Sequence, residues 1–302
     1  MNKLQIRNSF LLFVAAFIWG TAFAAQSIGM DYIEPFTFST LRSLIGSAFL
    51  VPCIGILGKW KGKKEERARE DKKELWKGGI VCGVVIFAAA NLQQTAMLYA
   101  SVGKSGFLTA LYIVIVPMIG IAFGKKPGKK LAVAVALAVV GLYLLCMKSG
   151  SFKLGFGDIL LLFSAFCFSV HILVIDHYTQ RADGVKLSCI QFLVCGVLSA
   201  VVMLLFEHPT LSAVQESLLS VLYVGILSSG VAYTLQIVGQ KGMNPVVASL
   251  IMSLESVISA IAGWAVLGQV LSGREIAGCF VMFLAIILAQ LPEKVELRKK
   301  SC

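Results

Sequence analysis

The chain has 302 residues, of which 58% are hydrophobic and only 14% are charged, and its formal net charge is +11. In soluble domains roughly a quarter of the residues are charged, so this composition excludes an ordinary soluble domain and indicates a membrane protein. The 8 cysteines show no CxxC spacing, which argues against a zinc site or a disulfide framework.

Ten apolar segments are long enough to cross a bilayer, because a hydrocarbon core of roughly 30 Å needs about 20 residues of α-helix. The sequence therefore predicts an all-α integral membrane protein with ten transmembrane helices. Few residues remain outside the segments, so we expect no soluble domain. In chain order the predicted segments are 8–28, 36–58, 75–98, 104–123, 131–148, 156–177, 187–206, 217–239, 245–267 and 275–291.

The positive charge is concentrated on one side of the predicted membrane. With the N-terminus inside, the inner termini and loops hold 22 of the 27 Lys and Arg residues. This bias follows the positive-inside rule and predicts a multi-pass protein of the plasma membrane, the inner membrane of a bacterium, with both termini cytoplasmic. The charge thus reports orientation, and we expect no nucleic-acid partner. The basic loop between Lys59 and Lys77 could in addition bind anionic lipid.

The hydrophobic pattern occurs twice along the chain. Residues 11–20 match residues 160–169 at four of ten positions, and the same offset of 149 places Arg42 opposite Gln191. Each half holds five predicted helices, and an odd number makes the halves run in opposite directions through the membrane. We therefore predict two inverted repeats, residues 1–148 with helices 1–5 and residues 149–302 with helices 6–10.

Short motifs are distributed over both halves. They are Ile18-Trp19-Gly20-Thr21, Pro35 followed by Arg42, and residues 103–117 in the first half, and residues 225–236, Pro245 and Ser253-Leu254-Glu255-Ser256-Val257 in the second. Together they resemble the drug/metabolite transporter superfamily, in particular its ten-helix EamA-type members, over nearly the whole chain. Ser256 departs from the proline that the family often has there. The resemblance implies a carrier that moves small metabolites, often outward, through a central cavity lined by both repeats.

Two ionisable residues lie at membrane depth, where such groups are costly and are functional candidates by default. Glu255 lies ten residues after Pro245, at a depth of about 15 Å by helical rise. It is either a site for a substrate ammonium group or a proton, or a structural acceptor for a helix terminus or a hydroxyl such as that of Ser253. Arg42 lies about 10 Å from the outer surface. Its side chain either reaches outward or pairs with a carbonyl, or it binds a carboxylate or phosphate in a bidentate manner.

Further polar and aromatic candidates lie in the same segments. The amides and hydroxyls either form hydrogen bonds between helices or line a polar cavity. Trp19 is either a stacking platform for the solute or a packing residue, and His171 is either a proton relay or a residue bonded to a neighbour. The candidates other than Trp19 and His171 are Asn91, Gln93 and Gln94 in the third helix and Tyr233 and Gln236 in the eighth.

The sequence therefore predicts a secondary transporter that moves a small polar metabolite, an amino acid-like or drug-like solute, by efflux or exchange through alternating access. A facilitator or channel-like permease is the alternative, followed by a membrane enzyme or scaffold that acts on lipid-linked substrates. No enzymatic activity, cofactor or metal is expected. The expected partners are the solute and the bilayer, and both a monomer and a homodimer remain open.

Overall fold

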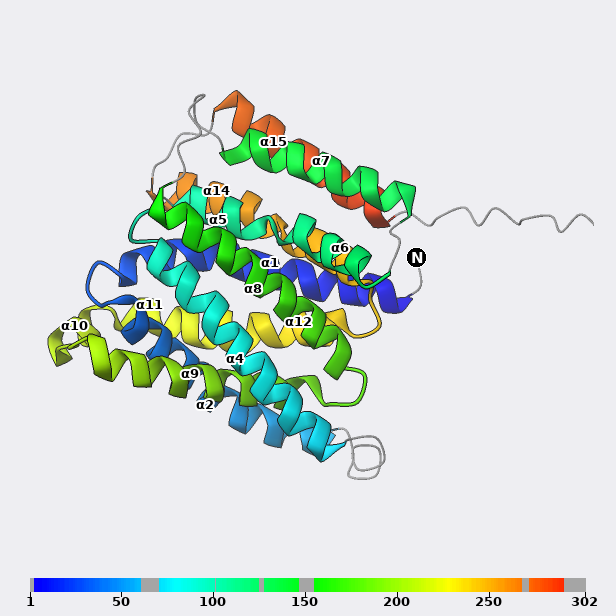
Figure 1. Cartoon of the computed structure of the whole chain (residues 1–302). Coiled ribbons are helices and arrows are strands. Elements are labelled where there is room, and N and C mark those ends of the chain that lie inside the picture. The colour runs from blue at the N-terminus through cyan, green and yellow to red at the C-terminus, as the bar shows by residue number, and fades with distance from the viewer. Residues whose placement is uncertain are drawn as a thin grey trace, which may run out of the picture.

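A computed structural model of the chain describes residues 3–60, 71–100, 102–124, 128–146, 155–267 and 272–290. Within these ranges every regular element is a helix and none is a strand. The helices run side by side along one common direction, so that most helices reach from one end of the bundle to the other (Figure 1). The all-helical part of the predicted fold class is thereby confirmed.

Eight helical segments of the described chain are long and apolar enough to cross a membrane. They are built from α1 (Lys3–Gly29), α2 (Pro35–Trp60), α4 (Lys72–Ala96), α5 with α6 (Val102–Ala110, Tyr112–Ala122), α8 (Phe156–Tyr178), α9 (Gly184–Phe206), α11, η1 and α12 (Leu218–Tyr223, Val224–Ala232, Tyr233–Gln240), and α13 with α14 (Pro245–Met252, Leu254–Leu267). Each segment overlaps one that the hydrophobic pattern predicts.

Two more apolar helices, α7 (Lys129–Cys146) and α15 (Gly273–Gln290), pack along each other at one edge of the bundle (Figure 1). They overlap the two remaining predicted segments. A short helix at the start of the eighth segment, α10 (Leu211–Glu216), was not predicted, because six residues with mixed polarity carry too little periodic signal.

Three membrane segments are interrupted, whereas the hydrophobic pattern predicts one continuous helix for each. The fourth breaks at Leu111 between α5 and α6, the eighth contains the π-helix η1, and the ninth breaks at Ser253 between α13 and α14. At Ser253 the hydroxyl donates to the Leu250 carbonyl at 2.7 Å and the Ser256 N–H bonds back to Ser253. Such tight turns replace the α-helical pattern, so the ninth helix is interrupted although Ser256 is not proline.

Helix starts are fixed by acceptors near their free N–H groups. Asp71 caps α4 and Asp183 caps α9, each with its own carboxylate, while Asn244 caps α13 just before Pro245. These residues end the loops, and the helices therefore begin close to the residues that the sequence predicts.

The start of α2 is different, since its acceptor comes from a distant helix. The carboxylate of Glu207, at the end of α9, accepts hydrogen bonds from the N–H groups of Phe36 and Thr37 at 2.8 and 2.6 Å and from the Thr37 hydroxyl at 2.7 Å. A carboxylate at a helix N-terminus is stabilised by the unpaired N–H groups and the helix dipole. The contact therefore joins α2 of the first half to α9 of the second half.

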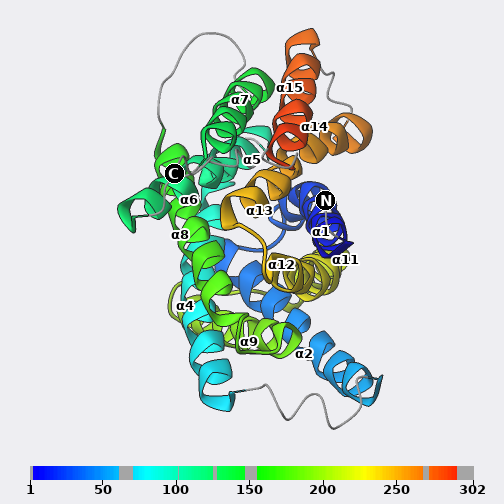
Figure 2. The ribbon, with the colours of Figure 1, turned by 90° about the vertical axis from the view of Figure 1, so that its right-hand side faces the viewer.

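The packing links the two halves throughout the bundle. Among other contacts, α2 lies against α9, α4 lies against α8 and α9, and α1 lies against α12 and α14, as a view along the bundle shows (Figure 2). Glycines permit the closest contacts: a Cβ on Gly83 of α4 would lie 2.5 Å from the Val194 side chain of α9, and one on Gly46 of α2 would lie 2.7 Å from Ser229 of η1. Small residues thus bring helix backbones together, as expected for packing within lipid.

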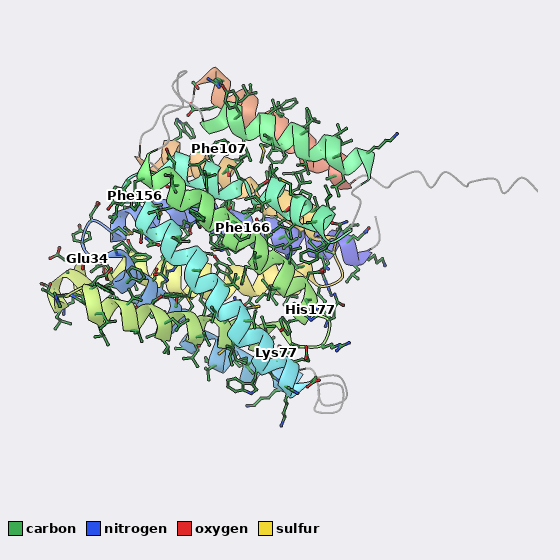
Figure 3. The ribbon with its side chains drawn as sticks, viewed as in Figure 1. Glu34, Lys77, Phe107, Phe156, Phe166 and His177 are labelled. Atoms are coloured by element: carbon green, nitrogen blue, oxygen red, sulfur yellow. The ribbon has the colours of Figure 1, made fainter. Side chains whose placement is uncertain are left out.

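The two ends of the bundle differ in their residues. Lys77 and His177 lie at one end, and Glu34 and Phe156 lie at the other (Figure 3). Residues 61–70 of the predicted cytoplasmic loop lie outside the described residues.

Candidate solute-binding cavity

A cavity lies in the middle of the bundle, where α1, α2 and the interrupted helices meet. The space between atoms in this region is about 480 Å³, including the part that is open to solvent. Its walls combine charged, amide and aromatic side chains from both halves of the chain. The lining residues are Trp19, Phe23, Gln26, Arg42, Gln93, Thr109, Tyr112, Phe168, Ile172, Ser228, Tyr233, Gln236, Met252 and Glu255.

Arg42 supplies a positive charge to the cavity. Its side chain is only 3% exposed, and its Nη1 donates to the Gln26 Oε1 of α1 at 2.8 Å. The Nε atom is buried without a hydrogen-bond partner. Within the described residues no carboxylate forms an ion pair with Arg42, so the charge of its guanidinium is not neutralised by a salt bridge there.

Glu255 supplies a negative charge from the first turn of α14. Its side chain is 5% exposed, and its Oε1 accepts a hydrogen bond from the Tyr112 hydroxyl at 2.9 Å. The Ser253 hydroxyl, which the sequence suggests as a partner, donates instead to the Leu250 carbonyl, and the Ser256 hydroxyl donates to the Gly106 carbonyl. The hydroxyl that Glu255 accepts is that of Tyr112.

Aromatic rings form another wall. The Trp19 and Tyr233 ring centroids are 4.7 Å apart, and Phe192 meets the Tyr233 ring edge-on at 5.1 Å. Phe168, which the repeat alignment places opposite Trp19, also lines the cavity. The Trp19 Nε1 is buried without an acceptor. Such surfaces favour the apolar or aromatic part of a ligand.

The predicted candidates divide into two groups. Arg42, Glu255, Tyr233, Trp19, Gln93 and Gln236 line the cavity. The other three do not: the Asn91 amide donates to Phe87 O and Ser199 Oγ, the Gln94 amide donates to the Met30 sulfur, and His171 Nε2 bonds to Gln191 Oε1 at 3.0 Å. In place of Asn91 and Gln94, their neighbour Gln93 faces the cavity and donates to Thr109 at 3.0 Å.

Gln26, Thr109 and Tyr112 are among the polar cavity residues that were not singled out from the sequence. Tyr112 and Thr109 lie within the motif of residues 103–117, so the signal was present, but their roles depend on which side of an interrupted helix faces inward. Gln26 is a lone amide at the end of α1. Its importance follows only from its contact with Arg42.

The described residues contain no group of three His, Cys, Asp or Glu side chains that could hold a metal ion. The cavity walls offer two charged groups, amides and aromatic rings. These features fit binding of a polar solute.

Comparison with known proteins gives a consistent result. The model of the EamA-like transporter family matches the chain twice, at residues 7–147 and 155–291. An uncharacterized transporter of Archaeoglobus fulgidus is 30% identical over 93% of this chain and 84% of its own length. The uncharacterized transporter YwfM of Bacillus subtilis is 22% identical over 95% of both chains. A solved crystal structure shares the fold with a TM-score of 0.76, at 19% identity, over 94% of this chain and 96% of that one.

Proposed function

Because the chain belongs to the EamA-like transporter family and is a multi-pass membrane transporter, we propose that it is a secondary transporter that moves a small polar solute across the plasma membrane by alternating access. The transport is efflux or exchange. The family and the names of the relatives point to a transporter rather than an enzyme.

The observation that carries the proposal is the pair of buried opposite charges on one cavity. Arg42 and Glu255 both line it, and neither forms an ion pair with a described residue. Burying a charge without an ionic partner costs several kcal/mol, roughly, unless a ligand or strong hydrogen bonds compensate. A solute with a carboxylate for Arg42 and an ammonium group for Glu255 would neutralise both. The solute class is therefore amino acid-like, with its side chain against Trp19 and Tyr233.

Ten helices in two inverted repeats are part of this proposal. Gly29 ends α1 and Tyr178 ends α8, while Pro35 starts α2 and Gly184 starts α9, and each pair is 149 positions apart. The family model also matches each half separately. These regularities support repeats at 1–148 and 149–302, with both termini cytoplasmic, that rock against each other around the cavity.

The test uses the purified full-length protein. Thermal-shift assays with single L-amino acids, their deaminated hydroxy acids and their amides should show stabilisation only by solutes that keep both charges. The stabilising solutes should then accumulate in proteoliposomes but not in empty liposomes. Failure of every zwitterion to stabilise the protein or to cross the membrane would refute the proposal.

A facilitator or channel-like permease is the second candidate, because the cavity alone does not define coupling. Flux of the same solute with and without a pH gradient separates the two. A secondary transporter coupled to protons responds to the gradient, whereas an exchanger requires solute on the other side and a facilitator requires neither. A membrane enzyme or scaffold that acts on lipid-linked substrates would show no solute flux at all.

A further inference from the structure

The hydrogen bond from Tyr112 to Glu255 connects the two helices that are interrupted at Leu111 and Ser253. Tyr112 is the first residue of α6, and Glu255 is the second residue of α14. Both side chains are buried and both line the cavity. The bond therefore joins the first half of the chain to the second at the wall of the site.

Both residues follow a local change in the helical hydrogen bonding. The Leu111 N–H bonds to Leu108 and the Val114 N–H bonds to Leu111, which are three-residue spacings, and the Ser256 N–H bonds to Ser253 with the same spacing. Such tight turns at membrane depth are tolerated where they are buried in protein or line a cavity. The position of each side chain then depends on a short, locally rewound segment rather than on one continuous helix.

Tyr112 is the only described side chain that donates a hydrogen bond to Glu255. The nearest serine hydroxyls, those of Ser253 and Ser256, donate to backbone carbonyls, and Ser259 donates to the Ser256 carbonyl. A hydrogen bond to a charged acceptor is stronger and more directional than one between neutral groups. Tyr112 therefore fixes one oxygen of the carboxylate, and the other oxygen is available to a ligand in the cavity.

We propose that Tyr112 is a positioning residue for Glu255: its hydroxyl holds the carboxylate so that the second oxygen faces the cationic group of the solute. This inference rests on the proposed function. Because Tyr112 and Glu255 belong to different halves, the carboxylate is aligned only while the halves keep this arrangement. The affinity for the cationic group is thus tied to one conformation, as alternating access requires.

Tyr112→Phe removes only the hydroxyl and keeps the ring. In proteoliposomes supplied with a mixture of radiolabelled L-amino acids, the variant should raise KM about tenfold or more, the effect of losing a hydrogen bond to a charged group, with the maximal rate within about twofold of the native protein. Tyr223→Phe is the matched control, since it also removes a tyrosine hydroxyl that bonds to a side chain of another helix, Thr21, and Tyr223 does not line the cavity. Its KM should stay within about twofold of the native value.

Two outcomes would overturn the inference: an unchanged KM for Tyr112→Phe, or equal changes in both variants. A second measurement does not depend on any solute. The melting temperatures of Tyr112→Phe, Glu255→Gln and the double variant should not be additive, because each single change removes the same bond; additive losses would contradict the bridge between the helices. If the native protein transports no amino acid but the losses of melting temperature are not additive, the proposed function fails, whereas the hydrogen bond between Tyr112 and Glu255 is supported.

Discussion

The predicted repeat aligns α2 of the first half with α9 of the second, but the two helices carry different side chains at the aligned positions. In the first half, Arg42 of α2 bonds to Gln26 of α1 and lines the cavity. In the second half, Gln191 of α9, at the aligned position, bonds to His171 of α8, and neither residue lines the cavity. The aligned positions thus hold a charged residue with its amide partner at the cavity in one half and a neutral pair away from the cavity in the other.

The fourth and ninth segments show the reverse distribution. Glu255 of α14 lines the cavity, whereas Val116 of α6 is buried in the hydrophobic core. Val116 is the counterpart of Glu255 when residues 103–117 are aligned with residues 242–256 at an offset of 139. Each half therefore contributes one charge, from a different helix. The difference teaches that the proposed repeats would bind an asymmetric solute through charges at non-equivalent positions.

The largest effect should come from Arg42→Gln. Removing one member of a buried charged contact costs about 2 to 5 kcal/mol, so we expect KM for a carboxylate-bearing solute to rise at least about thirtyfold in a proteoliposome flux assay. The KM of Arg42→Lys should fall between those of the native protein and Arg42→Gln, because lysine keeps the charge and loses the bidentate guanidinium. Normal flux in Arg42→Gln would show that the charge on α2 does not distinguish it functionally from α9, where Gln191 lies at the aligned position.

Glu255→Gln should have the next largest effect. We expect KM for a zwitterion to rise about tenfold to a hundredfold, because the neutral amide no longer attracts an ammonium group. The deaminated hydroxy acid is the control solute, and its much weaker uptake should not change. Flux measured between pH 5 and 8 should also lose its pH dependence in this variant. A Glu255→Gln protein that keeps native KM and native pH dependence would show that the carboxylate is only structural.

Gln191→Leu tests the neutral pair that Gln191 forms with His171. The side chains are similar in size, but the change leaves His171 Nε2 without its partner, which should lower stability by about 1 to 3 kcal/mol. Since the pair does not line the cavity, KM should stay within about twofold of the native value. A rise in KM as large as that of Arg42→Gln would show that both second helices bind the solute.

The smallest effect concerns the end of α4 that begins at Lys72. This end of the bundle carries lysines, in contrast to the end at Glu34. Lys73 and Lys77 lie on the same helix face as Trp76, which is 57% exposed, and Ile80 and Val84 continue that face toward the membrane centre. Lysines at this position attract acidic lipid with about 1 kcal/mol each. We expect Lys73→Gln with Lys77→Gln to lose, by a few degrees, the higher melting temperature that phosphatidylglycerol gives over phosphatidylcholine. An unchanged lipid preference would contradict this role.

The sequence predicts the helices well because apolar length and charge placement are strong signals. Each described membrane segment lies where the pattern places it, and Arg42 and Glu255 could be selected because charges within apolar segments are rare. Asn91, Gln93 and Gln94 could not be separated, since neighbouring amides in a helix point in different directions that depend on its rotation. The breaks at Leu111 and Ser253 were missed because their residues are apolar or small, and the turns arise from hydrogen bonds that only the folded bundle defines.

The bond network of Glu207 has a consequence for the motion of α2. Because Glu207 fixes the first residues of α2 to α9, that end can serve as a pivot. A helix of 26 residues is about 39 Å long, so a tilt of about 10° around the pivot moves its far end by about 7 Å. Arg42, only about 10 Å from the pivot, moves by about 2 Å. In the proposed rocking motion, the short distance from the pivot would keep Arg42 nearly still while the far end of α2 moves.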